Sequence, residues 1–391
     1  MEALVNRYAA RLRAAGLARA PLVCGLDDTI CWNRDHHDIA VLEEVMAGLN
    51  IASLICAEPA EPHRTILRYL TGQAGAALTP RDCETRTFLH DLPVARAFTT
   101  ETILARLRQR KSVIIADGER LVIITFGTVS PEQAFVTFSS VCFAAFVLFF
   151  TELLAAAKNG TISPDRLAAA RQVLALLAPP RLTAPSLLSG PFTSEEEVHA
   201  ALIEAGRLTV DYELVDSHFG NISYRLDDTV YISQTGSSLD ALAGCIDPCP
   251  LDDSSCAGIT ASSELSAHNE IYLRTDNRAI LHGHPRFAVI LSMDCDTPDC
   301  PDRGFCHIRC PRPHAINGIP VVPGEVGTGP TGLCHTLPPA MVDRPGVIVW
   351  GHGLFTVGRT DFNEAFSRLL AIENMCRSEY LARLQRVGCC L

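Results

Sequence analysis

The sequence is poor in positive charge. Its 391 residues include 33 Lys and Arg against 44 Asp and Glu, which gives a formal net charge of −11. Because phosphate contacts require clustered Lys and Arg side chains, we expect no nucleic acid among its partners. Apolar residues make up 48% of the chain, which excludes a disordered or fibrous protein.

The sequence also lacks a secretory signal. Residues 1–20 have the pattern of an amphipathic helix, with no continuous apolar region and no cleavage site after it. Residues 134–150 carry no charge, but this length only just reaches the lower limit for a membrane span. The segment begins with Ser130-Pro131, an N-cap followed by proline at the first helical position, as soluble helices do. We therefore expect a buried helix, no membrane partner and a cytoplasmic location.

Cysteine, in contrast, is abundant, with 16 in the chain. Proteins built on disulfides are usually short and secreted, and this chain is neither. Metal ligation and buried free thiols are the better first interpretations.

A proline-rich segment divides the sequence. Residues 178–193 contain four prolines with Ser and Gly and show no apolar periodicity. The pattern predicts an N-terminal domain over residues 1–177, a linker over 178–192 and a second domain over 193–391. Both halves combine apolar strand-like runs with capped helices, so the fold class is α/β. Asp117-Gly118 predicts a hairpin in the first half, and Thr193-Ser194 predicts the start of a helix in the second.

Three histidines in the second half form a candidate metal site. His282 and His284 alternate at the end of an apolar strand, so their imidazoles face the same side. His352 lies between two glycines in a turn that follows another apolar strand. Three histidine ligands leave one position of a zinc ion open, which is the pattern of a catalytic site. The alternative is that the pair at 282 and 284 is simply two polar residues at a strand end.

Three polar loops accompany these histidines. They are Gly220-Asn221-Ile222-Ser223, Ser233-Gln234-Thr235-Gly236-Ser237-Ser238 and Ser262-Ser263-Glu264. Loops of this kind offer backbone N–H and hydroxyl donors to an anion. Taken singly, each is equally compatible with a turn or a helix cap.

The order of these motifs resembles the class II aldolase/adducin family, over residues 193–380. The resemblance implies an α/β/α three-layer fold for the second domain, a homo-oligomer and a small-molecule substrate. It implies that His282, His284 and His352 bind a catalytic Zn²⁺ and that Glu264 is the catalytic acid or base. The residues that it implies for holding a substrate phosphate or carboxylate are Asn221, Ser223, Thr235, Gly236, Ser262 and Ser263.

The chemistry of such a site points to one kind of intermediate. Zn²⁺ can bind the oxygens of a hydroxy-carbonyl compound and stabilise an enediolate, while a carboxylate moves the proton. We therefore expect a metal-dependent lyase of aldolase type that acts on a small, in some cases phosphorylated, hydroxy-carbonyl substrate. The alternatives are an epimerase, a dehydratase or a decarboxylase of the same superfamily, or a non-catalytic scaffold like adducin. Family aldolases use a tyrosine after the His-x-His strand, and residues 292–323 contain none.

The same region contains a cysteine cluster. Cys295, Cys300, Cys306 and Cys310 lie within sixteen residues, among Asp, Pro and Gly. This composition is typical of a metal-binding knuckle, so we predict a second, structural metal there. Disulfides, an iron–sulfur cluster and free thiols are the alternatives.

The first half contains a faint internal repeat of the second. Residues 113–118, with the strand and helix after them, parallel residues 347–351 with their own strand and helix, and residues 54–59 parallel 280–285. We hypothesise that the N-terminal domain is a degenerate copy of the aldolase-like fold, with the zinc histidines replaced by Cys56, Glu58 and a glycine. Chance similarity is the alternative, and different strand orders would exclude the hypothesis. The nearby run Asp35-His36-His37-Asp38 is interpreted as a solvated turn.

Overall fold

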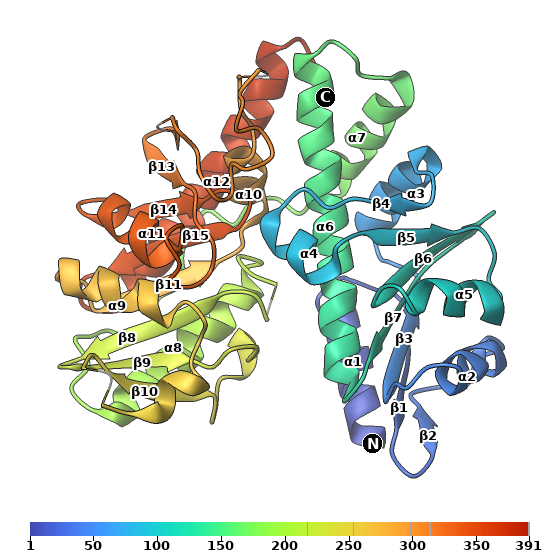
Figure 1. The fold of residues 1–391 in the computed structure, drawn as a ribbon, viewed down its shortest axis with the longest axis horizontal. Coiled ribbons are helices and arrows are strands. Elements are labelled where there is room, and N and C mark those ends of the chain that lie inside the picture. The colour runs from blue at the N-terminus through green and yellow to red at the C-terminus, as the bar shows by residue number, and fades with distance from the viewer. Residues whose placement is uncertain (217, 253, 298, 313, 390–391) are drawn as a thin grey trace. The chain divides into compact units, whose positions relative to one another are not determined.

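The computed structural model describes residues 1–389 except 217, 253, 298 and 313 (Figure 1). The chain forms two compact units. One comprises Met1–Ala178 and the end of the chain from Val387, and the other comprises Pro179–Arg386. The division falls at the start of the predicted linker.

The first unit contains a seven-stranded sheet with the order β2-β1-β3-β7-β6-β5-β4. Neighbouring strands are antiparallel except β5 and β6, which are parallel. The strands are β1 (Leu22–Leu26), β2 (Ile30–Trp32), β3 (Ser53–Ala57), β4 (Ala77–Leu78), β5 (Leu92–Ala95), β6 (Ser112–Asp117) and β7 (Arg120–Gly127). The helices are α1 (Glu2–Ala14), α2 (Ile39–Ala47), α3 (His63–Gln73), α4 (Cys83–Leu89), α5 (Thr100–Leu107), α6 (Pro131–Lys158) and α7 (Pro164–Leu176).

Local sequence signals explain much of this unit. The predicted hairpin forms at Asp117-Gly118, where Gly118 has a φ of +55° that suits glycine. Helices α2 and α5 pack with one face of the sheet, and α1 and α6 contact the strands as well. The charge-free segment lies within α6, and 89% of its most apolar window is buried inside the structure. This burial confirms the expected core helix.

The second unit contains an eight-stranded sheet with the order β10-β9-β8-β11-β15-β14-β13-β12. The strands are β8 (Asn221–Leu226), β9 (Thr229–Ser233), β10 (Ile246–Pro250), β11 (Ala279–Gly283), β12 (His314–Ile316), β13 (Ile319–Val322), β14 (Gly346–Val349) and β15 (Gly353–Gly358). The helices are α8 (Glu195–Asp211), α9 (Leu265–Arg274), α10 (Arg286–Ser292), α11 (Leu333–Met341) and α12 (Phe362–Arg386), with 3₁₀ turns at Leu239–Ala241 and Cys256–Ile259. Neighbouring strands are antiparallel except β13 and β14.

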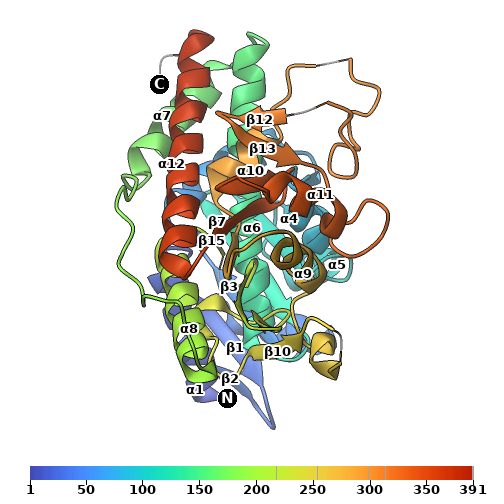
Figure 2. The ribbon, with the colours of Figure 1, turned by 90° about the vertical axis from the view of Figure 1, so that its left-hand side faces the viewer.

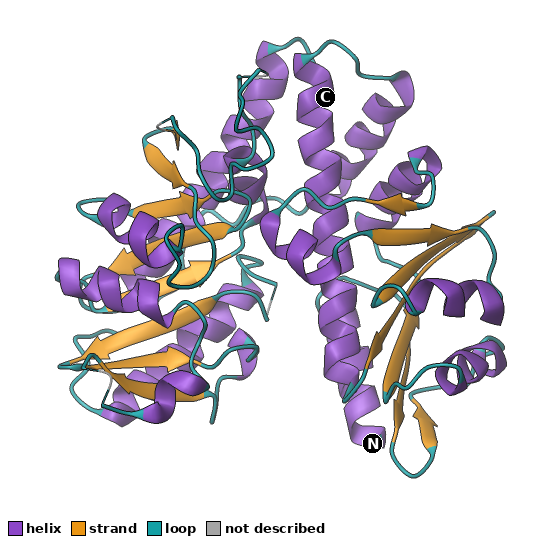
Figure 3. Ribbon diagram, viewed as in Figure 1, coloured by secondary structure: helices purple, strands orange, loops and turns teal. Residues whose placement is uncertain are grey.

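The second unit has three layers. Helices α9 and α11 share one hydrophobic core with the sheet, and α8, α10 and α12 contact its strands too. Figure 2 shows α8 and α12 on one side of the strands and α9 and α11 on the other. Figure 3 shows the same layering as sheets flanked by helices in each unit. The α/β/α architecture predicted for the second domain is therefore confirmed.

The helix cap at the start of this unit matches the sequence prediction. The Ser194 side chain accepts a hydrogen bond from the Glu197 backbone at the start of α8. The proline-rich segment before it has no helix or strand, yet it is packed on this unit. Leu187 and Phe192 are buried, and the Leu187 N–H donates to the Asn363 side chain at 2.9 Å.

Candidate active site

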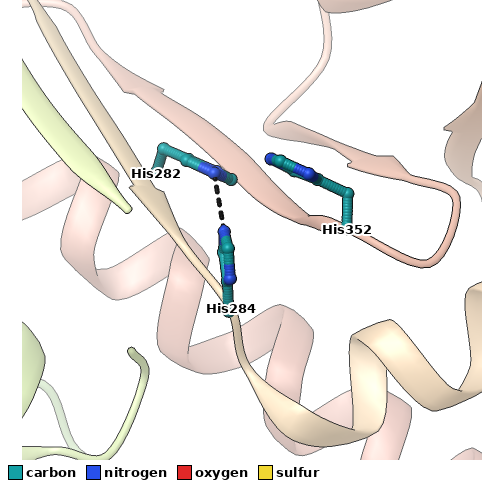
Figure 4. A group of neighbouring side chains, drawn as sticks. All are labelled: His282, His284 and His352. Atoms are coloured by element: carbon teal, nitrogen blue, oxygen red, sulfur yellow. Dashed lines mark hydrogen bonds between the residues drawn. The ribbon is translucent and has the colours of Figure 1, made fainter. Parts of the chain in front are cut away.

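The three predicted histidines converge at one end of the second sheet (Figure 4). His282 lies in β11, His284 follows that strand and His352 lies in the turn between β14 and β15. The Nε2 atoms of His282 and His284 are 3.0 Å apart, and the ligand atoms of all three lie within 4.8 Å of one another. All three side chains are buried. The sequence prediction that these side chains come together is confirmed.

A glycine makes room for this convergence. Strand β15 begins at Gly353, directly beside β11. A Cβ atom at Gly353 would lie 2.5 Å from the Gly283 carbonyl oxygen, 2.6 Å from His282 Cε1 and 2.7 Å from His284 Cδ2. Such contacts are too short for any side chain, so the two flanking glycines of His352 have different uses. Gly351 has a φ of +59° that allows the turn, and Gly353 allows the close approach of the imidazoles.

Glu264 completes the group from the start of α9. Its Oε1 lies 3.0 Å from His352 Nε2, and its Oε2 lies 3.5 Å from His282 Nε2. The Asn221 side-chain amide donates a hydrogen bond of 2.6 Å to Oε2. Glu264 and Asn221 are both buried. A carboxylate held this close to the histidines is placed to move a proton at a bound substrate.

Burial and hydrogen bonding set the protonation states of the site. Burial, opposed by Glu264 and aided by nearby His352, lowers the pKa of His282 to about 4. Burial also holds the pKa of His284 well below its ordinary value. Burial opposes ionisation of Glu264, but His282, the hydrogen bond with His352 and that from Asn221 together lower its pKa. At neutral pH His282 and His284 are neutral and the Glu264 carboxyl is ionised.

These groups fit a divalent metal of zinc type. His282 Nδ1 lies 3.2 Å from the Leu354 carbonyl oxygen, so that nitrogen carries the proton and donates. The Nε2 lone pair of His282 is then directed at the other imidazoles. Two nitrogens that each lie about 2.0 Å from a tetrahedral zinc are about 3.3 Å apart, close to the spacing found here. The donor set of three imidazoles beside one carboxylate suits a divalent metal such as zinc.

The predicted anion-binding loops divide into two groups. Thr235, Gly236 and Ser263 are exposed, and Ser262 is buried beside Glu264, whose N–H donates to the Ser262 hydroxyl at 3.3 Å. These residues stay predicted substrate ligands. Gly236 has a φ of +74°, which favours glycine in this loop.

Ser223 departs from the prediction. Its hydroxyl is fully buried and lies 2.6 Å from His268 Nδ1 and 2.7 Å from the Tyr272 hydroxyl. Since both partners belong to α9, Ser223 fixes this helix against β8 instead of facing a substrate. Of the two residues predicted from the Gly220–Ser223 loop, only Asn221 contacts the site, through its hydrogen bond to Glu264.

Sequence reasoning missed two supporting residues. His268 lies one turn after Glu264 in α9, and burial lowers its pKa to about 3, so it is neutral. Ser292, at the end of α10, accepts a hydrogen bond of 2.8 Å from the Gly351 N–H and so holds the turn that carries His352. The four-residue spacing from Glu264 was a signal for His268. The contact of Ser292 joins distant segments and left no local signal.

The cysteine cluster, unlike the three histidines, is not among the groups of described residues whose ligand atoms converge. Cys295, Cys300, Cys306 and Cys310 are free thiols. Burial raises the pKa of Cys306, and the nearby thiols raise it further. Among the described residues, the groups that bring three ligand atoms within 4.8 Å are His282–His284–His352 and His36–His37–Asp38. The second metal at the cysteines stays a prediction.

Tyr380 is part of the hydrophobic core. Its side chain is fully buried in α12, and its ring packs 5.4 Å from that of Phe287. Tyr380 therefore belongs to the core between α12 and α10.

Known proteins resemble this half of the chain. Residues 200–380 match the family model of the Class II Aldolase and Adducin N-terminal domain. A 3,4-dihydroxyphthalate decarboxylase of Terrabacter sp. (strain DBF63) is 27% identical over 201 residues, which are 49% of this chain and 82% of the relative. A methylthioribulose-1-phosphate dehydratase of Gluconobacter oxydans (strain 621H) is 27% identical over 198 residues, 47% of this chain and 91% of the relative.

A solved structure resembles it as well. The l-fuculose-1-phosphate aldolase of Thermus thermophilus is 24% identical with a TM-score of 0.39, and the match covers 48% of this chain and 97% of that one.

The fold and the site define a three-layer α/β domain with a buried cluster of histidines and a carboxylate. Together with the family match, they place residues 200–380 in the class II aldolase/adducin family. The resemblance predicted from the order of the motifs is therefore confirmed.

Proposed function

We propose that the second unit is a metal-dependent lyase that acts on a small hydroxy-carbonyl substrate. The observation that carries the proposal is the convergence of His282, His284 and His352 with ligand atoms within 4.8 Å, beside the buried carboxylate of Glu264. A scaffold would gain nothing from burying these polar groups together, because their desolvation costs stability.

Each residue has a distinct task. The three imidazoles would hold a zinc ion through nitrogen lone pairs, and the ion would supply Lewis-acid polarisation of a substrate carbonyl. Glu264 is ionised and accepts a proton from the substrate carbon or oxygen next to that carbonyl. Asn221 orients Glu264 with its amide N–H. The Asn221 Oδ1 atom is buried without a hydrogen-bond partner among the described residues, so it can accept from a substrate hydroxyl.

The reaction class is supported at the level of lyases. The curated relatives are named as a decarboxylase and a dehydratase, and the matching family model is named for aldolases. All three reactions break a C–C or C–O bond next to a polarised carbonyl. Residues 292–323 contain no tyrosine to protonate an aldehyde leaving group. Dehydration or decarboxylation therefore fits the site better than aldol cleavage does.

Proton exchange tests this proposal without the natural substrate. Dihydroxyacetone phosphate and hydroxyacetone in D₂O serve as probes, and deuterium incorporation is followed by NMR. We expect exchange with the zinc-loaded protein and a reduction of about 10²–10⁴-fold in Glu264→Gln. His335→Ala, a change at an exposed histidine of α11, is the control and keeps the wild-type rate.

Equal exchange rates in the wild type and in Glu264→Gln would contradict the assignment of Glu264. A metal-loaded wild type that exchanges neither probe would favour a non-catalytic scaffold.

A further inference from the structure

The two units share one topology. The order β2-β1-β3-β7-β6-β5-β4 of the first sheet matches β9-β8-β11-β15-β14-β13-β12 of the second, strand for strand in chain order. Every antiparallel pair corresponds to an antiparallel pair. The one parallel pair, β5 with β6, corresponds to β13 with β14. The second sheet adds β10 at its edge. Different strand orders would have excluded the internal repeat, and the orders are the same.

Side-chain hydrogen bonds repeat in the same register. The Thr125 hydroxyl, in β7, donates to the Ala134 carbonyl of α6 at 2.8 Å. The Thr356 hydroxyl, in β15, donates to the Ala365 carbonyl of α12 at 2.9 Å. Both threonines precede their partner by nine residues, at the same place in the sheet. Such a detail is not a requirement of the strand order, so the correspondence extends to individual residues.

A second pair of hydrogen bonds repeats at the other edge of the sheet. The Val23 N–H of β1 donates to the Asn33 side chain at 2.7 Å. The Ile222 N–H of β8 donates to the Ser233 hydroxyl at 3.2 Å. Asn33 follows β2, and Ser233 is the last residue of β9. The register of the two sheets is therefore the same across four strands.

This register gives the equivalents of the active-site residues. In the first sheet Cys56 pairs with Leu22 on one side and Ile124 on the other, and in the second sheet His282 pairs with Asn221 and Phe355. Cys56 therefore stands where His282 stands, and Leu22 where Asn221 stands.

Two carboxylates also correspond. Asp38 precedes α2 as Glu264 precedes α9, and both are buried at the helix start. Glu58 follows β3 where His284 follows β11. The Glu58 carboxylate forms an ion pair with the nearby Arg64 at 2.7 Å, so its negative charge already has a side-chain partner.

The hairpin that carries His352 differs between the units. In the second unit the ladder ends with Val349 paired to Gly353, whereas the ladder of the first unit extends as far as Asp117 paired with Arg120. In the first unit the additional pairs of the ladder, Ala116–Leu121 and Asp117–Arg120, stand where the second unit has the turn with His352. The longer hairpin brings Arg120 to Asp38. The two terminal nitrogens of Arg120 each donate to Asp38 Oδ1 at 3.2 Å. Its guanidinium also lies 4.1 Å from the centre of the Phe98 ring.

We propose that Arg120 occupies the place of the metal ion in the first unit, so that this unit is a metal-free, non-catalytic copy of the second. A guanidinium is permanently charged and satisfies the carboxylate of Asp38 without any ion. A divalent cation at that carboxylate would meet this charge at close range. The inference depends on the proposed function only in treating the second unit's histidines as a metal site.

The pair His36 and His37 gives the inference a sharp test. Their ring nitrogens lie 3.5 Å and 3.4 Å from the Asp38 carboxylate oxygens, and with it they could hold a metal if Arg120 were absent. The sequence interpretation of this run as a solvated turn is therefore wrong for Asp38, which is buried in an ion pair. We infer that Asp38 forms an ion pair while Arg120 is present and that His36, His37 and Asp38 could bind a metal once Arg120 is removed.

The experiment measures bound zinc per chain by equilibrium dialysis in a His284→Ala background, where the histidine site of the second unit no longer binds. We expect about one equivalent more zinc in His284→Ala/Arg120→Ala than in His284→Ala, whatever the cysteine cluster of the second unit binds. Adding Asp38→Asn to His284→Ala/Arg120→Ala should remove this additional zinc again. His284→Ala/Arg120→Lys keeps the positive charge and should bind no more zinc than His284→Ala. Circular dichroism melts verify that each variant is folded.

Two results would overturn the inference. One is zinc in His284→Ala that disappears with Asp38→Asn, because the first unit would then bind metal in spite of Arg120. The other is a folded His284→Ala/Arg120→Ala protein that binds no more zinc than His284→Ala does. The proposed function fails separately, if the wild type and His284→Ala bind the same amount of zinc.

Discussion

At the residue scale, the site depends on a few atoms that leave no freedom for substitution. Gly353 is the sharpest case, because any Cβ there would contact both the His282 and His284 rings. Glycine is required here for space, since its φ lies outside the left-handed region. The sequence suggested a close approach from the flanking glycines of His352, but it could not assign the approach to Gly353 and the turn to Gly351.

Gly353→Ala is the corresponding prediction. We expect it to lower the free energy of unfolding by about 1–3 kcal/mol and to weaken zinc binding, because the imidazoles must move apart. Gly75→Ala is the matched control, since a Cβ at Gly75 meets nothing within 4 Å, and it should stay within about 0.5 kcal/mol of wild type. Chemical denaturation and zinc titration measure the two effects. A Gly353→Ala protein with unchanged zinc affinity would show that the contact is easily relieved.

The buried histidines also predict a pH dependence. Burial lowers the pKa of His282 to about 4, below the value of 6.5 for a free histidine. Protons therefore compete with zinc only at acidic pH, and zinc should be retained at pH 6 and released as the pH falls toward 4. Dialysis at a series of pH values, followed by metal analysis, measures the release.

The stability of the metal-free protein depends on pH with the same sign. Because the pKa of His282 is lower in the folded state than in the unfolded state, its contribution to stability is complete above pH 6.5 and is lost as the pH falls toward 4.

For the zinc-bound protein, zinc release centred at or above pH 6.5 would contradict buried, neutral ligands.

At the scale of elements, strand ends and helix starts place the chemistry. His282 and His284 belong to one strand end, and Glu264 precedes a helix that packs on the same face of the sheet. The sequence predicted these elements from apolar runs and caps. It did not predict β12, β13 or α11, because these are short or contain Pro338 and Pro339 inside a helix. Local signals are weakest where tertiary packing decides the structure.

The support of the histidine turn by α10 gives a prediction at this scale. Ser292→Ala leaves the buried Gly351 N–H without its acceptor, which should cost about 1–3 kcal/mol of unfolding free energy. It should also weaken zinc binding, because the turn carries His352. Ser378→Ala, at an exposed serine of α12, serves as the control. Ser292→Ala with wild-type stability and zinc affinity would mean that the turn is held by other contacts.

At the scale of the whole molecule, one topology occurs twice in a single chain. The repeat was visible in the sequence as two short parallels, around residues 54–59 and 113–118. Its extent was not, because Arg120 has no counterpart of similar chemistry to align and Cys56 stands where His282 stands. The proline-rich division was visible, but not the packing of Leu187 and Phe192 on the second unit.

Separate cores and one metal site predict separate responses to metal removal. The chain divides into two units, and the histidine site lies in the second. We expect a chelator to lower the unfolding temperature of the second unit while that of the first stays constant. Calorimetry with and without chelator measures both unfolding temperatures. Arg120→Ala should lower the unfolding temperature of the first unit, which the chelator leaves constant. A uniform shift of all unfolding would contradict the assignment of the metal to one unit.

The metal content of purified wild type, His284→Ala and His335→Ala tests the central claim most directly. The account predicts zinc in the wild type and in His335→Ala, and a loss of that zinc in His284→Ala. Unchanged zinc in His284→Ala would contradict a metal centre at His282, His284 and His352.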